Sequence, residues 1–228
     1  MKYVLVLCDG MADYPVKSLN GKTPLEAAKT PNMDALAQTA QIGLVKTVPD
    51  GFKPGSDVAN LGVLGFDART CYTGRSPLEA LSIGIDLKAD DLAMRANLVT
   101  LSDDEPFEDK IMLDYSSGEI DADEARELMD CVKDNFNCDK FRFYTGTSYR
   151  NCLVVSRAKP EEDLTPPHDI SGLRIGEYLP KGTLGKDLTS FVVNSYEILK
   201  DHPVNVRRIE RGENPCLLYT SPSPRDTR

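Results

Sequence analysis

The chain has 228 residues, of which 40% are hydrophobic and 28% are charged, and its formal net charge is −9. This length suits one large domain or two smaller ones, and the apolar content is sufficient for a buried core. The acidic charge argues against nucleic acid and anionic membranes as partners, because the overall field attracts neither. A local basic pocket for a small anion is compatible with it.

Six cysteines are scattered along the chain without a C-x-x-C pair, a distribution that predicts reduced thiols rather than a disulfide framework. Residues 4–8 are too short for the core of a signal peptide, and no stretch approaches the roughly 20 apolar residues of a membrane span. We therefore expect a cytoplasmic protein.

The N-terminal part reads as alternating strands and helices. Residues 4–7 form a continuous apolar run, which predicts a parallel strand in the middle of a sheet. A helix is predicted from Thr30-Pro31 to about residue 40, followed by a second strand over 44–48. This order favours an α/β sheet with right-handed crossovers.

The next predicted helix begins at Ser76-Pro77, with Glu79 completing a capping box, and a strand follows over 97–101. From about residue 102 the sequence indicates a smaller α+β lobe. Its predicted elements are a helix over 121–136 capped by Asp121 and Glu124, strands over 141–145 and 151–156, and a helix over 184–200. The Ser-Pro repeats after residue 215 predict a disordered tail.

Two polar residues stand where α/β folds place ligands. Asp9 follows the first predicted strand, and Ser56 is predicted as the N-cap of a helix with Val58, Leu61 and Leu64 on its apolar face. A phosphate at that helix end would meet unpaired backbone N–H groups. Alone, Ser56 reads more simply as an ordinary cap, and Asp9 equally well as a turn opener. Together they outline a metal-assisted phosphoryl-transfer site.

Asp9 and Ser56 alone cannot supply the free energy that phosphoryl transfer requires. A helix terminus contributes about 0.3–1 kcal/mol, whereas phosphate-ester chemistry demands on the order of 20 kcal/mol. Activating a serine hydroxyl therefore calls for metal ions, and one aspartate with one serine cannot hold two of them.

Eight short segments carry a family resemblance. They are residues 7–15 (LCDGMADYP), 21–28 (GKTPLEAA), 54–61 (PGSDVANL), 72–75 (YTGR), 95–100 (RANLVT), 114–118 (DYSSG), 148–150 (SYR) and 165–170 (TPPHDI). In combination they resemble the archaeal-type cofactor-independent (2,3-bisphosphoglycerate-independent) phosphoglycerate mutases of the alkaline phosphatase superfamily. The resemblance spans residues 1 to about 215.

The resemblance implies an α/β fold, with a partial alkaline-phosphatase-like sheet flanked by helices and an inserted smaller α+β lobe. Residues 1–101 would belong to the metal and phosphoryl-transfer domain and residues 102–215 to the inserted lobe that caps the substrate. Residues 216–228 would be a disordered, non-native tail.

The resemblance also implies residue roles. Ser56 would accept a phosphoryl group from 3-phosphoglycerate and return it to the 2-hydroxyl, and Asp9 and Ser56 would bind metal. Two divalent ions (Mn, Zn or Mg) are implied, without 2,3-bisphosphoglycerate. Arg95, Arg150 and His168 are the candidates for the phosphate and carboxylate of the substrate. In simpler interpretations, Arg95 is a surface residue of a strand, Arg150 lies at a sheet edge, and His168 is a loop histidine. The implied partner is a small phosphorylated substrate, with no nucleic acid or membrane.

One departure from the family pattern shapes the expectation for activity. Family members continue into a second catalytic segment with further aspartate and histidine ligands, whereas this chain has two histidines in total. We therefore expect a truncated reading frame that is inactive and prone to aggregate. The nearest alternative is a related metal-dependent phosphotransferase or phosphatase, such as a homoserine-kinase-like enzyme. A third reading is a non-catalytic, anion-binding fragment.

Overall fold

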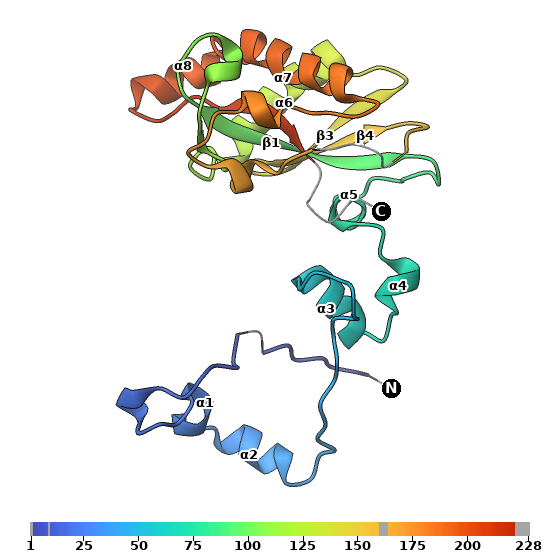
Figure 1. Cartoon of the computed structure of the whole chain (residues 1–228), viewed down its shortest axis with the longest axis vertical. Coiled ribbons are helices and arrows are strands. Elements are labelled where there is room, and N and C mark those ends of the chain that lie inside the picture. Colours follow the sequence, from blue (N-terminus) through green and yellow to red (C-terminus); the bar gives the residue numbers. More distant parts are fainter. Residues whose placement is uncertain (1, 9, 160–163, 222–228) are drawn as a thin grey trace. The chain divides into compact units, whose positions relative to one another are not determined.

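The computed structural model describes residues 2–8, 10–159 and 164–221 (Figure 1). The chain separates into two compact units, Met1–Lys46 and Thr47–Arg228. The functional division at residues 101 and 102 predicted from the sequence stays a prediction.

The first unit contains η1 (Lys17–Leu19), α1 (Pro24–Ala27) and α2 (Pro31–Ala37). A reciprocal capping box starts α1: the Thr23 hydroxyl accepts from the Glu26 N–H at 3.2 Å, and the Glu26 carboxylate accepts from the Thr23 N–H at 2.8 Å. The helix predicted at Thr30-Pro31 is confirmed as α2, which has Thr30 at its N-cap.

The strands predicted over residues 4–7 and 44–48 are corrected by the structure. Neither segment is a strand, and Val4, Val6 and Leu44 are exposed. A β-strand needs a neighbour to take its backbone N–H and C=O groups, and none of the described strands pairs with these segments. An apolar run therefore does not become a strand here, although its composition suits one.

The second unit is built on a five-stranded sheet. Its strands are β1 (Leu92–Leu101), β2 (Met112–Asp114), β3 (Phe141–Thr147), β4 (Arg150–Val155) and β5 (Leu217–Ser221). The order is β2-β1-β4-β3, and β5 also pairs with β1. All of these pairings are antiparallel, so the fold is mixed α/β with an antiparallel sheet, and the strands predicted after residue 96 are confirmed.

Helices α6 (Ala122–Phe136) and α7 (Gly185–Leu199) lie over one face of this sheet (Figure 1). The core between them contains Met94, Leu98, Phe143 and Leu153 from the strands, Leu128 and Val132 from α6, and Leu188 and Val192 from α7. Both helices are confirmed. The remaining helical elements are α3 (Ser56–Val63), α4 (Ala68–Cys71), α5 (Arg75–Ser82), η2 (Phe107–Asp109), η3 (Pro167–Ile170), η4 (Gly176–Tyr178) and α8 (Pro203–Glu210).

The disordered tail expected after residue 215 is wrong for residues 216–221. Leu217–Ser221 form β5, which pairs with β1 with Leu218 opposite Leu98. Tyr219 is fully buried, and its hydroxyl donates to the Tyr178 carbonyl at 2.9 Å. The apolar run that starts at Cys216 finds an edge of β1, whereas the Ser-Pro repeats that suggested disorder continue into residues 222–228, which lie outside the described residues.

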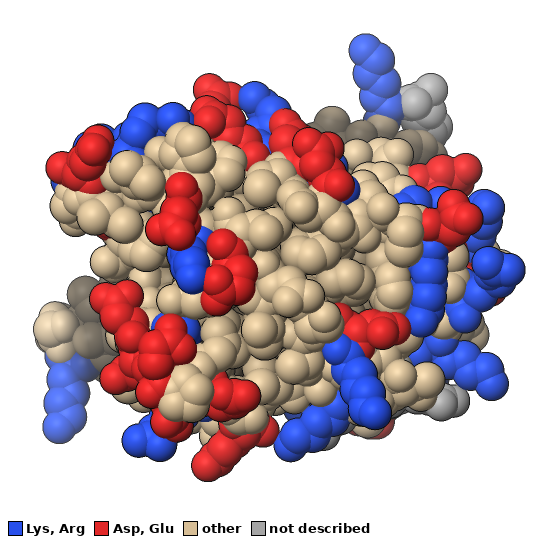
Figure 2. Space-filling model, turned by 90° about the horizontal axis from the view of Figure 1, so that it is seen from above, with Lys and Arg blue, Asp and Glu red and all other residues tan. Residues whose placement is uncertain are grey.

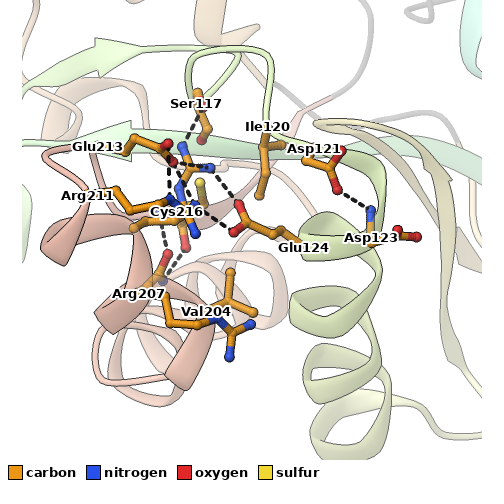
Figure 3. A network of polar contacts seen from close by, with 12 residues as sticks. Ser117, Ile120, Asp121, Asp123, Glu124, Val204, Arg207, Arg211, Glu213 and Cys216 are labelled. Atoms are coloured by element: carbon orange, nitrogen blue, oxygen red, sulfur yellow. Dashed lines mark hydrogen bonds and ion pairs between the residues drawn. The ribbon is translucent and has the colours of Figure 1, made fainter.

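A network of ion pairs fastens α8 and the segment entering β5 to the start of α6 (Figure 3). The buried Arg208 donates to the carbonyls of Asn214 (2.9 Å) and Ser117 (3.1 Å) and pairs with Glu124 at 2.9 Å. Arg211 pairs with the same carboxylate at 2.6 Å. Burial opposes ionisation of Glu124, but the hydrogen bonds from both arginines lower its pKa overall. Glu124 therefore joins two helices and does not cap α6 as predicted.

The surface of the second unit carries both signs of charge. Figure 2 shows acidic and basic side chains interspersed around a broad uncharged area. Within the described ranges, no helix has the length and apolar character needed to cross a membrane.

Candidate functional site

Ser56 is the first residue of α3 and not its N-cap, which corrects the prediction. The N-cap is Gly55, whose backbone is extended and which has no side chain to accept a capping hydrogen bond. The side chain of Ser56 is exposed. A glycine N-cap supplies no side chain to the first-turn N–H groups, and a helix start is a position at which backbone N–H groups can bind an anion.

The residue after Ser56 ties α3 to a distant part of the sequence. The Asp57 carboxylate accepts a hydrogen bond from the Tyr72 hydroxyl, and the Tyr72 ring packs edge-on against Phe52 with centroids 6.2 Å apart. Gly62 permits a close approach on the same helix, because a Cβ there would clash with the Thr47 carbonyl. These contacts fix the orientation of α3 relative to Tyr72, which lies three residues before α5.

Glu79 on α5 has a different role from the capping box predicted at Ser76. Gly74 is the N-cap of α5, and the Glu79 carboxylate accepts from Arg75 Nε at 3.0 Å and from Arg95 Nε at 2.6 Å. Arg95 Nη2 pairs with the same carboxylate. Burial opposes ionisation of Glu79, but hydrogen bonds and charge from Arg95, and then from Arg75, lower its pKa overall. A charged Glu79 therefore links α5 to β1.

Arg95 projects from β1, and its side chain is 12% exposed. Its partner in the β1–β4 register is Cys152, so the two side chains share a face of the sheet. Burial, together with the nearby charge of Glu79, raises the pKa of Cys152 to about 12. The thiol is therefore neutral, and Arg95 supplies the positive charge on this part of the face.

Arg150 begins β4 and is held by its sequence neighbour. Its Nε and Nη2 atoms donate to the Tyr149 hydroxyl at 3.0 and 2.8 Å, and its guanidinium lies 5.0 Å from the centre of the Tyr149 ring. The β3–β4 hairpin needs glycine at Gly146, because a Cβ there would clash with the Arg150 carbonyl. The Asn151 side chain accepts from the Gly146 N–H at 3.0 Å and completes the hairpin.

These elements enclose a cavity of about 180 Å³. Its polar lining comes from α5, β1 and the β3–β4 hairpin and includes Ser76, Glu79, Arg95, Arg150 and Asn151. The charged residues of the lining are two arginines and one glutamate, which leaves an excess of one positive charge. Arg95 and Arg150, both candidates from the sequence, line the same cavity, and their contacts to a substrate stay a prediction.

His168, the third candidate, stands apart from this lining. It lies in η3, its side chain is 42% exposed, and it faces Asp169 at 3.5 Å. Its ring is 6.0 Å from that of Tyr115, which in turn is 6.2 Å from that of Tyr149. Two tyrosines therefore connect His168 to Arg150, and the structure does not bring the histidine into the cavity.

Asp9, the predicted metal ligand, lies outside the described residues, so its convergence with Ser56 stays a prediction. Across residues 2–8, 10–159 and 164–221 the structure brings together no group of three or more histidine, cysteine, aspartate or glutamate side chains that could hold a metal ion. The described residues thus do not form a metal centre by themselves, and the two divalent ions also stay a prediction.

Sequence reasoning missed two residues of this site, Glu79 as the partner of the arginines and Tyr149 as the support of Arg150. The first had a signal, since Arg75 and Glu79 stand four residues apart on one helix, the spacing of an ion pair. The second had none, because a tyrosine beside an arginine is not a motif.

Comparison with known proteins identifies the family. The family model for 2,3-bisphosphoglycerate-independent phosphoglycerate mutase matches residues 37–205. This chain belongs to that family. A probable 2,3-bisphosphoglycerate-independent mutase of Geobacter sulfurreducens is 48% identical over 95% of this chain and 54% of its own length, and the mutase of Methanosarcina mazei is 47% identical over 95% and 53%. The chain thus spans about half the length of the curated relatives it matches.

Solved structures support the same assignment. A cofactor-independent phosphoglycerate mutase of Thermoplasma acidophilum aligns with a TM-score of 0.55 and 28% identity, over 94% of this chain and 58% of its own. A protein of Pyrococcus horikoshii aligns with a TM-score of 0.66 and 28% identity, over 94% and 49%. Membership of the mutase family and the mixed α/β fold class, both expected from the motifs, are confirmed.

Proposed function

We propose that this chain contributes the serine nucleophile and the anion-binding cavity of a cofactor-independent phosphoglycerate mutase, which interconverts 3-phosphoglycerate and 2-phosphoglycerate through a phosphoserine. The observation that carries the proposal is a cavity of about 180 Å³ whose lining includes both Arg95 and Arg150. The names of the relatives point to the same reaction.

The charges of the cavity fit this substrate class. A phosphoglycerate carries a phosphate and a carboxylate, and a guanidinium group can give each of them two parallel hydrogen bonds. Glu79 balances part of the positive charge and holds Arg95 in one orientation through two of its nitrogen atoms. A ligand therefore meets arginines that are already positioned, which reduces the entropy lost on binding.

In the proposed reaction the Ser56 oxygen forms a bond to phosphorus while the bond between phosphorus and the C3 oxygen breaks. The serine proton is transferred to the leaving C3 oxygen. In the second step the 2-hydroxyl oxygen forms a bond to the phosphorus of the phosphoserine while the bond between phosphorus and the Ser56 oxygen breaks. The proton of the 2-hydroxyl returns to the Ser56 oxygen, and 2-phosphoglycerate is released. Ser56 is the first residue of α3, so the phosphoryl group would lie at the positive end of that helix.

The same proposal includes the cofactors, the partner and the compartment that the family resemblance implies. Divalent ions (Mn, Zn or Mg) held by Asp9 and Ser56 would lower the cost of forming a serine alkoxide, and 2,3-bisphosphoglycerate is not required, as the family name states. The partner is a small phosphorylated substrate, and the compartment is the cytoplasm.

Anion binding is tested by titrating 3-phosphoglycerate into this chain in a calorimeter. Arg95→Gln and Arg150→Gln should each weaken binding about tenfold or more, because each removes one charge-assisted contact. Arg207→Gln is the matched control, since Arg207 is a half-exposed arginine paired with Glu127 at 3.1 Å outside the cavity. Equal affinities for all four proteins would refute the cavity as the substrate site.

The nucleophile is tested by mass spectrometry after this chain, fused to the part of the Geobacter sulfurreducens mutase that it does not cover, is incubated with 3-phosphoglycerate and Mn²⁺. Phosphate is expected on Ser56 and should be absent in Ser56→Ala. Ser76→Ala is the control, because Ser76 is the buried serine that lines the cavity. Phosphate on Ser76 would identify Ser76 as the nucleophile in place of Ser56. A parallel incubation with homoserine and ATP tests the related phosphotransferase, and binding without label would indicate an anion-binding fragment.

A further inference from the structure

Asn97 on β1 carries a buried side-chain oxygen without a partner. The residue is 3% exposed, and its Oδ1 atom has no hydrogen-bond partner among the described residues. A buried carbonyl oxygen in this state has lost the hydrogen bonds that water gives it in the unfolded chain, so native proteins rarely leave one unpaired. Such an oxygen therefore indicates a donor that the chain itself does not supply.

The strand register places Asn97 beside both candidate arginines. Asn97 follows Arg95 by two residues on β1, so the two side chains lie on the same face of the sheet. On the neighbouring strand β4, Asn97 is paired with Arg150. Side chains paired in this way have Cβ atoms about 4.5–5.5 Å apart. Asn97 therefore lies next to the cavity that both arginines line.

The side chains paired with Asn97 direct their own donors elsewhere. Arg150 donates from Nε and Nη2 to the Tyr149 hydroxyl, at 3.0 and 2.8 Å. On the other side of β1, Asn97 is paired with Tyr219, whose hydroxyl donates to the Tyr178 carbonyl at 2.9 Å. The neighbouring strands therefore leave the Asn97 oxygen available as an acceptor.

The chemistry of a phosphoglycerate supplies a donor for this oxygen. Its phosphate and carboxylate accept hydrogen bonds from guanidinium groups, but its free hydroxyl also needs an acceptor, which a guanidinium cannot be. In the cavity lining, the Glu79 carboxylate already accepts from Arg95 at 2.6 Å. The Asn151 side chain accepts from the Gly146 N–H at 3.0 Å. The unpartnered oxygen of Asn97 is more available than either of these.

We infer that Asn97 is a specificity-determining residue whose Oδ1 atom accepts a hydrogen bond from the free hydroxyl of the bound phosphoglycerate. In 3-phosphoglycerate this is the 2-hydroxyl, which accepts the phosphoryl group in the second step of the proposed reaction. The contact distinguishes a hydroxy acid from a phosphorylated acid of the same charge, which the arginines alone cannot do. The inference rests on the proposed function, because it takes the cavity as the substrate site.

The test combines a ligand without the hydroxyl and a variant without the acceptor. Calorimetric titration compares 3-phosphoglycerate with 3-(phosphonooxy)propanoate, which lacks the 2-hydroxyl. We expect the original chain to bind 3-phosphoglycerate about tenfold more tightly. In Asn97→Leu the two affinities should differ by less than about twofold, because leucine has a similar size and no oxygen. A selectivity that survives in Asn97→Leu would overturn the inference and leave the proposed function standing.

Asn151→Leu is the matched control, since Asn151 is an equally buried asparagine with partners. Its side chain accepts from the Gly146 N–H at 3.0 Å and donates to the Tyr149 carbonyl at 3.3 Å. Without ligand, the urea midpoint should fall more in Asn151→Leu than in Asn97→Leu, whose oxygen has no hydrogen bond to lose. A fall in Asn97→Leu as large as that in Asn151→Leu would overturn the inference, because it would reveal a structural partner of Asn97.

Failure of the proposed function would give different results. If the original chain does not bind 3-phosphoglycerate, both the cavity as substrate site and this inference are overturned. If the expected selectivity is found but no phosphate forms on Ser56, the proposed reaction is contradicted and this inference stands.

Discussion

Glu79 is the residue on which the arrangement of the cavity depends most directly. Its carboxylate is about two-thirds covered and compensates Arg95, whose side chain is 12% exposed. Glu79→Gln removes that compensation, and we expect the free energy of unfolding at pH 7 to fall by about 1–3 kcal/mol. Urea denaturation followed by near-ultraviolet circular dichroism measures this change. Glu127→Gln is the control, since its pair with Arg207 is half exposed on both sides and should cost under about 1 kcal/mol.

The ion pair between Glu79 and Arg95 predicts that the stability of the chain depends on pH. The pKa of Glu79 is lowered from its ordinary value of 4.5. The contribution of the ionised carboxylate to the free energy of unfolding is therefore complete above that value and is lost as the pH falls through the lower folded-state pKa. Glutamine does not titrate. The difference in stability between the original chain and Glu79→Gln should therefore be constant from pH 7 to about 5 and shrink toward pH 3. A difference that grows on acidification would contradict the ion pair.

Five of the six cysteines are predicted to fall into two reactivity classes, and the sixth, Cys131, is of intermediate exposure. Burial raises the pKa of Cys152 to about 12 and that of Cys216 to about 11, so both are protonated as well as covered at pH 8. Cys8, Cys71 and Cys138 are exposed. Alkylation at pH 8 with peptide mapping should label the three exposed thiols rapidly and the two buried ones after denaturation. Rapid labelling of native Cys216 would show that β5 does not cover it.

The shared location of two candidate residues was predictable from the sequence because chemistry restricts the choice, whereas their roles toward a substrate stay predictions. Arg95 and Arg150 were selected because guanidinium groups suit anionic ligands, and the structure places both on one cavity. Ser56 was placed one position wrongly, since a glycine can take the extended backbone of an N-cap as readily as a serine. Glu79 was assigned to a cap because the spacing from Ser76 fits one, but a buried arginine on β1 is a stronger partner for its carboxylate than a backbone N–H.

At the scale of elements, β5 is the feature with the largest predicted effect on stability. Leu218 is 1% exposed and pairs with Leu98 on β1. Leu218→Ala should lower the free energy of unfolding by about 2–5 kcal/mol, because it removes buried methyl groups and leaves a cavity. Ile209→Ala, on an exposed face of α8, should change it by less than about 0.5 kcal/mol. Equal, small effects in urea denaturation would contradict the placement of residues 217–221 in the sheet.

Helices were predicted more successfully than strands, for a physical reason. The apolar stripes of α6 and α7 are local patterns, and each helix forms its hydrogen bonds within itself. A strand forms its hydrogen bonds with another segment, so its existence depends on a partner that periodicity does not reveal. Residues 4–7 have strand composition without a partner, and residues 217–221 look irregular but pair with β1.

At the scale of the whole molecule, the two units differ in what holds them together. The second unit contains a continuous core between its sheet and α6 and α7, whereas the described residues of the first unit contribute nothing to that core. The stabilising free energy of a domain comes mainly from buried apolar surface. The measured stability of this chain should therefore belong to the second unit.

Removing residues 1–46 tests this directly. Because no described residue of that segment is buried, we expect the free energy of unfolding of the remaining chain to stay within about 1 kcal/mol of the original. The denaturant slope should fall only slightly, since it scales with the surface exposed on unfolding. The chain has no tryptophan, so tyrosine circular dichroism in urea is the suitable signal. A loss of several kcal/mol would show that the first unit is part of the cooperative fold.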